Sequence, residues 1–316
     1  MLKCINMPRW VFPLIIVSVL ILVLEYYTLQ AFKTVFKNKW VSYVFLAVSM
    51  LAYFNFFFTI YSYDRSNGQT KQFQWAIGFL IIALIPKIMI FIILLSEDII
   101  RVFNKGISNL TSNVTKPISG RRKFISQIAL VLASIPLASI IYGVIKGKYN
   151  FKVLTYELSF VDLPEAFDGF SITQITDIHS GSLDNEEKVA YAVDLVNDQK
   201  SDVILFTGDI VNNFAKEMDP WIDVFKKLEA PIGKYSILGN HDYGDYADWK
   251  SKDDKKANFI AVKDVHSKIG FDLLLNENRY IEKDGERIAL IGVENWGKGF
   301  NKAGDLKKAS EGIQRE

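Results

Sequence analysis

The sequence predicts a membrane region followed by an α/β domain, and each half of the chain shows this in its own way. Residues 1–146 hold four long apolar stretches, which bring the hydrophobic share of the 316 residues to 50% and the aromatic share to 14%. Residues 147–316 alternate β-rich runs with amphipathic helical runs, a pattern typical of a parallel sheet covered by helices. Short polar motifs follow three of these runs, at the strand ends where open α/β sheets place their sites.

Each apolar stretch is long enough to cross a bilayer as a helix, since about 20 residues suffice. The spans are predicted at residues 10–31, 40–63, 73–96 and 124–145. A buried core helix is the alternative for each of them, and more so for the first and third, which Glu25 and Lys87 interrupt. A removable signal peptide is a further alternative for the first, but its length and the lack of a small-residue cleavage site argue against this.

Lys87, beside Pro86, has two interpretations. A charge inside a membrane is costly and often marks a transport or proton-relay site. A lone lysine also snorkels to the interface or faces a neighbouring helix. No partner for Lys87 is identifiable in the sequence, so both interpretations stay open.

The distribution of Lys and Arg predicts the orientation. Nine lie in the first and third connections between spans, against seven in the amino-terminal stretch, the second connection and the segment after the fourth span. The positive-inside rule places the first and third connections in the cytoplasm and the α/β domain outside it. Arg121 and Arg122 resemble a twin-arginine export signal, although a cytoplasmic charge cluster is the simpler interpretation. We expect a multi-pass protein of a bacterial cell membrane with an extracytoplasmic domain.

The α/β half is expected to contain its elements in the following order. An edge strand is predicted at residues 151–160, and buried strands at 169–176, 202–207 and 233–238. Helices are predicted between the buried strands at 186–199 and 218–228, and after them at about 259–269. Two further strands, at 272–275 and 288–293, complete the pattern.

Three polar motifs end strands of this predicted sheet. They are Asp-Ile-His at 177–179, Gly-Asp at 208–209 and Gly-Asn-His-Asp at 239–242. Their first residues of a metal-binding type, Asp177, Asp209 and Asn240, are 32 and 31 positions apart. Each motif alone is ordinary for a turn or a helix cap, but all three in order at strand ends indicate a metal site.

The residue types suit divalent cations. Asp177 and His179 are two residues apart, so at a strand end both point to one side and can hold one cation. Asp209 can bridge to a second cation, Asn240 offers that cation an amide oxygen, and His241 can reach a substrate. Two such metals activate water for attack on a phosphoryl group. This ligand set suits manganese, iron or zinc better than calcium.

The motifs, with Gly-Asp-Ile-Val-Asn at 208–212 as the second, resemble the first three blocks of the calcineurin-like metallophosphoesterase superfamily, over about residues 165–300. The membrane-anchored bacterial branch with YkuE-like and YaeI-like phosphodiesterases is the most similar. The resemblance implies a hydrolase of phosphodiester or pyrophosphate bonds that uses a hydroxide activated by two metal ions. It assigns the first metal to Asp177, His179 and Asp209, and the second to Asp209 and Asn240. It makes His241 the general acid or transition-state donor.

The later blocks of that superfamily, a further histidine and a Gly-His-x-His motif that complete both metal shells, have no match in the sequence. His266, the remaining histidine, falls within a predicted helix and fits neither block. We therefore expect a chain truncated at its carboxyl end. Two other interpretations stay open: a catalytically incomplete remnant, and a membrane sensor or transport module built on the four spans.

The expected partners are the lipid bilayer and a phosphoester substrate that is lipid-linked or derived from the cell envelope. The positive residues behind the net charge of +2 are spread over loops and helices, so nothing indicates nucleic-acid binding. Tyr243, Tyr246 and Trp249 follow the third motif. They form a lip for an acyl or aromatic group, or else they pack onto the sheet.

Overall fold

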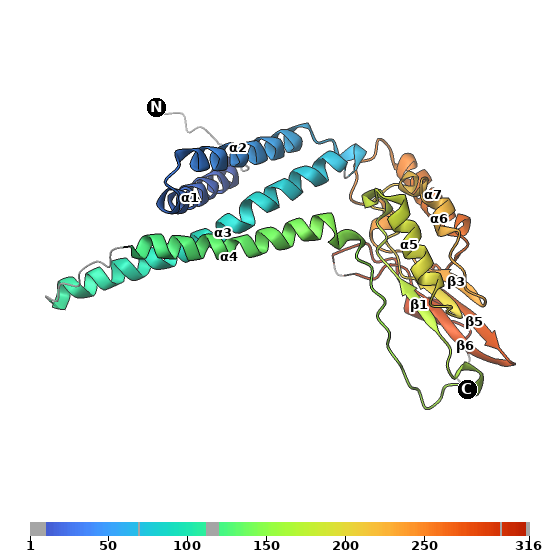
Figure 1. The fold of residues 1–316 in the computed structure, drawn as a ribbon. Helices are drawn as coiled ribbons and strands as arrows, with labels where there is room; N and C mark the ends of the chain where they lie inside the picture. Colours follow the sequence, from blue (N-terminus) through green and yellow to red (C-terminus); the bar gives the residue numbers. More distant parts are fainter. Residues whose placement is uncertain (1–10, 69, 112–119, 298, 314–316) are drawn as a thin grey trace. The chain divides into compact units, whose positions relative to one another are not determined.

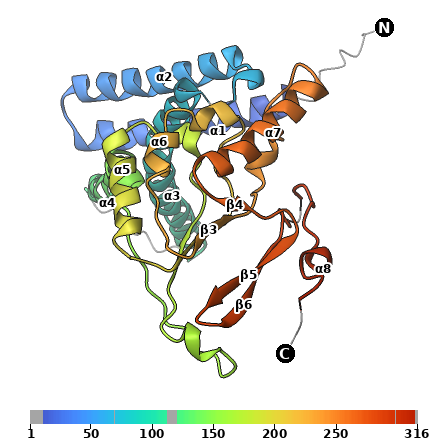
Figure 2. The same ribbon diagram turned by 90° about the vertical axis from the view of Figure 1, so that its right-hand side faces the viewer.

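The computed structural model describes residues 11–68, 70–111, 120–297 and 299–313. The chain divides into two compact units, a set of long helices and an α/β unit (Figures 1 and 2). The first comprises Met1–Tyr63 and Gln72–Lys148, and the second Asp64–Lys71 and Tyr149–Glu316. Trp10, at the start of the first predicted span, and Lys3, Arg9 and Lys116, which enter the orientation argument, lie outside the described residues.

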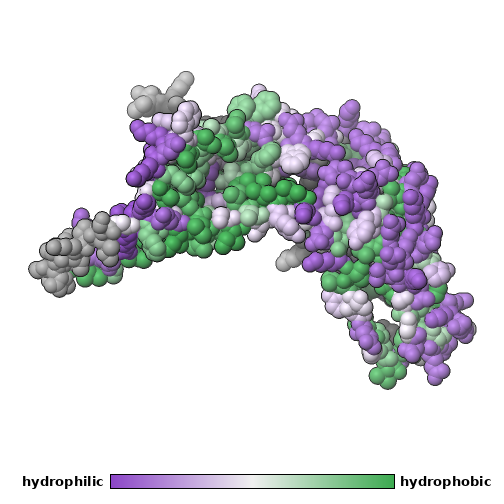
Figure 3. Space-filling model, viewed as in Figure 1, coloured by the Kyte–Doolittle hydropathy of each residue, from purple (hydrophilic) through white to green (hydrophobic). Residues whose placement is uncertain are grey.

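Long helices form the first unit. They are α1 (Val11–Val35), α2 (Lys39–Ser62), α3 (Lys71–Thr111) and α4 (Arg121–Ile145). Each is long and apolar enough to cross a membrane, so the prediction of four membrane helices is confirmed. α3 extends beyond the predicted span to Thr111. The segment after Ser96 contains no proline that would end the helix, so the helix continues past the end of the apolar run. Apolar side chains such as Val48, Leu51 and Phe54 are exposed, and Figure 3 shows apolar surface on the helices.

Lys87 has a partner within the first unit that the sequence did not reveal. It is 4% exposed, and its ammonium group contacts the carboxylate of Glu25 on α1. It also donates to Ser49 Oγ and Tyr53 Oη on α2, at 2.8 and 3.1 Å. Tyr53 Oη donates to the same Glu25 carboxylate at 2.7 Å. The network joins three helices, so Lys87 faces its neighbours within this unit.

The two arginines that resemble an export signal are also paired within this unit. Arg122 Nη1 lies 2.6 Å from Glu97 Oε2 and 2.9 Å from Asp98 Oδ1. Arg121 Nε lies 3.6 Å from Glu97 Oε1, and Glu97 is 5% exposed. A buried carboxylate needs charged partners, so these contacts favour a charge cluster that ties the start of α4 to α3.

A four-stranded parallel sheet lies at the centre of the second unit, in the order β1-β2-β3-β4. The strands are β1 (Ile172–Ile175), β2 (Val203–Phe206), β3 (Gly233–Ser236) and β4 (Asp272–Leu273). The helices α5 (Glu186–Asn197), α6 (Ile222–Phe225) and α7 (Lys252–Lys268) connect them in turn. Val193, Phe206, Leu238 and Val262 are among the buried residues of the core that these elements share. The predicted α/β class is therefore confirmed.

Some elements differ from the prediction. No described segment pairs with residues 151–160, which form no strand, and Leu154 and Tyr156 are exposed there. A strand needs backbone hydrogen bonds to a neighbour, and an apolar pattern does not supply one. The helix predicted at 218–228 is split into a 3₁₀ turn, Ala215–Met218, and the short α6, with Pro220 between them. Proline donates no N–H to a helix. α7 begins earlier than predicted because the Ser251 side chain caps it.

An antiparallel hairpin follows the sheet. It consists of β5 (Glu277–Lys283) and β6 (Glu286–Gly292), and the short helix α8 (Leu306–Ala309) comes after it. β6 was predicted and β5 was not. The two residues between them, Asp284 and Gly285, have φ of 50° and 88°, as a two-residue hairpin turn requires.

Candidate metal centre

The three polar motifs meet at the carboxyl ends of β1, β2 and β3. These strands are parallel neighbours in register. The loops that follow β1, β2 and β3 are called the first, second and third loops. The first two continue the hydrogen-bond ladder beyond the strands, because Asp177 N donates to Gly208 O and His179 N donates to Asp209 O, both at 3.0 Å. Neighbouring loops at one edge of the sheet therefore carry every predicted site residue.

Three of the predicted site residues adopt the left-handed backbone conformation, which is unfavourable for residues other than glycine. The φ angles of Asp177, His179 and Asp209 are 53°, 44° and 60°. Six non-glycine residues of the described chain have positive φ, so half of them lie here. The left-handed region costs a non-glycine residue about 1 kcal/mol or more, and such residues cluster at functional sites. Their concentration on candidate ligands indicates a functional requirement.

The second and third loops cross so closely that glycine is required in both. A Cβ on Gly208 would lie 2.3 Å from Gly239 N. A Cβ on Gly239 would lie 2.2 Å from Asp209 Oδ1. Without side chains at the two glycines, the backbone of the third loop lies directly against the Asp209 carboxylate.

Asp242 holds this crossing together. It is fully buried, and its Oδ2 accepts from the N–H groups of Asp209 and Gly239 at 2.9 and 2.8 Å. Its Oδ1 accepts from Ile210 N at 2.9 Å and from Val211 N at 3.4 Å. Burial raises the pKa of the Asp242 carboxyl to about 7, while these donors favour the ionised form. Asp242 was not among the predicted site residues, although its place directly after His241 is a signal in the sequence.

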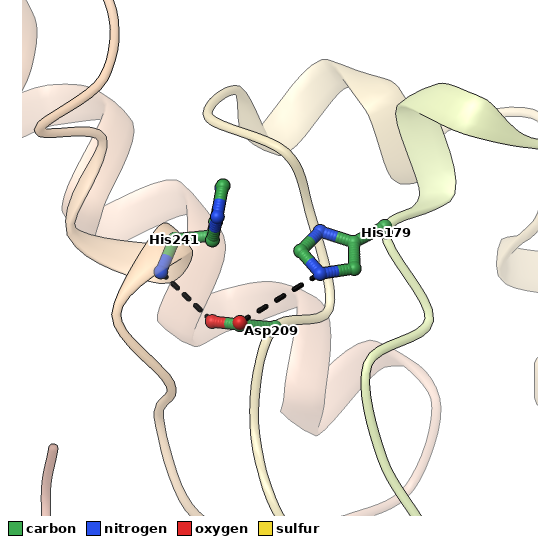
Figure 4. Close-up of side chains that lie close together, drawn as sticks. All are labelled: His179, Asp209 and His241. Carbon is green, nitrogen blue, oxygen red and sulfur yellow. Dashed lines mark hydrogen bonds and ion pairs between the residues drawn. The ribbon is translucent and has the colours of Figure 1, made fainter. Parts of the chain in front are cut away.

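The side chains of the first two loops converge. His179 Nε2 lies 3.7 Å from Asp177 Oδ1 and 3.7 Å from Asp209 Oδ2. Figure 4 shows the Asp209 carboxylate between His179 and His241, and ligand atoms of these three residues lie within 4.8 Å of one another. Two atoms bound about 2.1 Å from one cation are about 3.0 Å apart at a right angle and about 4.2 Å apart when opposite. The two separations of 3.7 Å from His179 Nε2 therefore fit a shared divalent cation.

The third loop presents Asn240 and His241 beside this group. His241 N donates to Asp209 Oδ1 at 2.8 Å, and His241 Nδ1 lies 2.8 Å from Asn212 O. A carbonyl oxygen only accepts, so Nδ1 carries a proton and Nε2 is left for other contacts. Asn240 Nδ2 donates to Tyr246 Oη at 2.8 Å, which leaves the amide oxygen available as a ligand.

A cavity of about 390 Å³ opens at this edge of the sheet. Asp177, Asp209 and Asn240 line it, and so do Glu294 and Trp296 from the segment after β6. Glu294 and Trp296 were not among the predicted site residues. They lie far beyond the third motif in the chain, and no local pattern links them to it.

The aromatic residues after the third motif divide between site and core. Tyr246 contacts Asn240, as described above. Tyr243 is 8% exposed and stacks on Phe259. Trp249 packs against Phe214. Tyr243 and Trp249 thus follow the packing alternative, and Tyr246 is the residue of the three that contacts a predicted site residue.

His266 belongs to the core and not to the candidate ligand group. It is fully buried on α7, and its Nδ1 lies 2.9 Å from Ser236 Oγ. Burial lowers its pKa to about 4, so the ring is neutral at pH 7. Among the described residues, the group of possible metal ligands at the strand ends does not include it.

Two families match the chain. Residues 8–148 match the family described as "Probable Calcineurin-like phosphoesterase, transmembrane domain". Residues 170–304 match the family described as "Calcineurin-like phosphoesterase". The first range contains the membrane helices, and the second contains all of the predicted site residues.

Several known proteins are similar over part of the chain. The uncharacterized metallophosphoesterase YkuE of Bacillus subtilis is 40% identical over 86 residues, 27% of this chain and 30% of that protein. A transmembrane protein with metallophosphoesterase domain from Danio rerio is 27% identical over 173 residues, 53% and 36% of the two chains. An uncharacterized metallophosphoesterase from Aquifex aeolicus is 30% identical over 95 residues, 30% and 36%. The chain thus spans about a third of the length of these relatives. No solved structure matches it significantly.

Proposed function

We propose that this chain, whose residues 8–148 and 170–304 match two families of calcineurin-like phosphoesterases, is a membrane-anchored hydrolase of phosphoric esters that works with bound divalent metal ions. Residues 1–146 are the proposed membrane region, and residues 147–316 the phosphoesterase domain. The observation that carries the proposal is the convergence of Asp177, His179 and Asp209, all in the left-handed backbone conformation. Strain at converging residues of metal-binding type is typical of a functional site.

We assign the first metal to Asp177, His179 and Asp209, and the second to Asp209 and Asn240. When bound, two divalent ions such as manganese, iron or zinc polarise a phosphoryl group and make water nucleophilic at neutral pH. Asp209 is 7% exposed, and the backbone N–H of His241 donates a hydrogen bond to its Oδ1. Its Oδ2 is therefore fixed on the side of His179, 3.7 Å from Nε2.

We assign proton donation to His241. The Asn212 carbonyl holds Nδ1–H, so Nε2 is the atom that exchanges a proton with substrate. In the protonated imidazole, Nε2–H donates to the oxygen of the leaving group as water adds to phosphorus and the bond to that oxygen breaks. The proton that the attacking water loses passes to the solvent. The leaving group then departs as a neutral hydroxyl, and the proton on Nε2 is replaced from water.

The substrate class follows from the membrane anchor. We propose a phosphodiester or pyrophosphate that is lipid-linked or derived from the cell envelope, because the four helices keep the domain at a bilayer. The excess of Lys and Arg in the first and third connections supports an extracytoplasmic domain. The proposal places the protein in a bacterial cell membrane.

The test is Mn²⁺-dependent hydrolysis of bis-p-nitrophenyl phosphate by the full chain in detergent micelles. Asp177→Ala should abolish turnover, and since this side chain is 60% exposed, the fold should not suffer. Asp209→Ala should have the same effect. Asp223→Ala serves as the control, because its side chain is 95% exposed and lies outside the cavity.

Wild-type turnover in both the Asp177→Ala and Asp209→Ala variants would overturn the assignment. A wild-type chain that binds Mn²⁺ and hydrolyses no phosphoester would overturn the enzymatic proposal and favour the remnant interpretation.

A further inference from the structure

Tyr246 contacts two neighbouring residues of the third motif at once. Its ring stacks on the His241 ring, with centroids 4.4 Å apart and planes at 27°. Its hydroxyl accepts a hydrogen bond from Asn240 Nδ2 at 2.8 Å. One side chain therefore restrains both the proposed amide ligand and the proposed proton donor.

We propose that Tyr246 is a positioning residue of the phosphoesterase site, which holds Asn240 and His241 in the orientations that their roles require. The proposal rests on the function proposed above. It adds a residue that lies outside the three motifs.

The contact with Asn240 determines which atom of the amide is free. An asparagine side chain carries one oxygen and one nitrogen, and only the oxygen ligates a cation. Because Nδ2 is bonded to Tyr246 Oη, the oxygen stays free and the side chain does not rotate at random. Partners of this kind, one step behind a metal ligand, typically change metal affinity about 10- to 100-fold.

The contact with His241 limits rotation of the imidazole. Two other contacts already restrain the ring. Its Nδ1 lies 2.8 Å from Asn212 O, and the His179 ring packs edge-on against it, with centroids 4.7 Å apart and planes at 90°. Tyr246 covers one face. The ring cannot turn about its Cβ–Cγ bond without losing the stack, so Nε2 keeps one direction.

Other contacts hold the segment that carries Tyr246. Trp249 Nε1 donates to Gly244 O at 2.8 Å, and the rings of Trp249 and Phe214 pack with their centroids 5.1 Å apart. The Lys255 ammonium contacts the Asp245 carboxylate. Tyr246 thus lies on a loop that its own contacts hold in place, and this loop supports the positions of Asn240 and His241.

The experiment compares Tyr246→Phe and Tyr246→Leu with wild type, using the full chain in detergent micelles. Mn²⁺ binding is measured by titration calorimetry, and phosphodiester hydrolysis is measured as kcat and KM at saturating Mn²⁺. Tyr246→Phe keeps the ring and loses the hydroxyl, so the Mn²⁺ site that includes Asn240 should lose affinity by about 10- to 100-fold while kcat at saturating Mn²⁺ is unchanged. Tyr246→Leu also loses the stack on His241, so its kcat should fall as well, while KM stays as in wild type.

Tyr149→Phe is the matched control. It removes a hydroxyl that bonds Asp184 at 2.6 Å, and neither residue lines the cavity. We expect this variant to bind Mn²⁺ and turn over substrate as wild type does.

Unchanged Mn²⁺ affinity and unchanged kcat in both Tyr246 variants would overturn the proposal. A lower melting temperature with wild-type Mn²⁺ affinity would also overturn it, since Tyr246 would then be purely structural. A wild-type chain that binds no Mn²⁺ would overturn the proposed function itself, so the two failures are distinguishable.

Discussion

Replacing Asp242 by asparagine should loosen the crossing of the second and third loops. Each oxygen of the buried carboxylate accepts two backbone N–H groups, Oδ2 from Asp209 and Gly239, and Oδ1 from Ile210 and Val211. Asparagine has the same shape but carries an NH₂ group in place of one oxygen. Whichever way the amide turns, this NH₂ group meets two N–H donors that have lost their acceptor.

The magnitude follows from those two donors. A buried N–H group without an acceptor costs about 1–3 kcal/mol, so the pair costs about 2–6 kcal/mol. The amide should turn its NH₂ group to the Oδ1 side, where the bond to Val211 N is long at 3.4 Å, which favours the lower end. Since 1.4 kcal/mol is a factor of ten, amide exchange in the loop should accelerate by about 30-fold or more.

Hydrogen–deuterium exchange of the full chain in micelles measures this effect, followed in peptides that cover residues 206–212. Asp223→Asn is the matched control, because its side chain is 95% exposed, and exposed substitutions change stability by about 0.5 kcal/mol or less. If Asp242→Asn exchanges within about threefold of wild type, the carboxylate is not what holds the loop, and the reasoning is wrong.

Three further changes test other parts of the molecule. Gly239→Ala should abolish Mn²⁺ binding in calorimetric titration, because its Cβ would lie 2.2 Å from a carboxylate oxygen of the second loop; binding like that of Gly143→Ala, whose Cβ meets nothing within 4 Å, would contradict this. His266→Leu should flatten the pH dependence of the melting temperature. Burial lowers the folded pKa of His266 to about 4, so protonation of the unfolded chain removes up to about 3 kcal/mol of stability as the pH falls from 6.5 toward 4. Equal slopes in variant and wild type would show that His266 does not cause this loss. Lys87→Met should destabilise the membrane helices by about 3–5 kcal/mol because it leaves the Glu25 carboxylate without its cationic partner. The double variant Lys87→Met/Glu25→Gln should recover most of this loss in melting experiments. A single variant as stable as wild type would show that the ion pair contributes nothing.

Local signals in the sequence were sufficient for much of the fold. The membrane helices were predictable because a bilayer demands long apolar runs, and such runs need no knowledge of their neighbours. The buried strands β1, β2 and β3 were predictable for a similar reason, since short apolar runs bounded by turn residues read as strands. β5 is polar and was missed, although the Asp-Gly pair at 284–285 is a strong hairpin signal.

Residues 151–160 show the opposite case. Their pattern suits a strand, yet no described segment pairs with them. Whether an extended segment becomes a strand depends on backbone hydrogen bonds to another segment, and periodicity does not report those.

Neighbouring residues were sufficient to predict the membrane helices, the α/β domain and the three motifs of metal-binding residue types at successive strand ends, because each of these is a local pattern. The folded chain was needed to show that Glu25 is the partner of Lys87, that Asp242 holds two loops together, and that Tyr246 contacts both Asn240 and His241. Spacing along a strand or helix shows which face of an element is buried. It does not show which residue lies opposite, because that depends on the path of the whole chain.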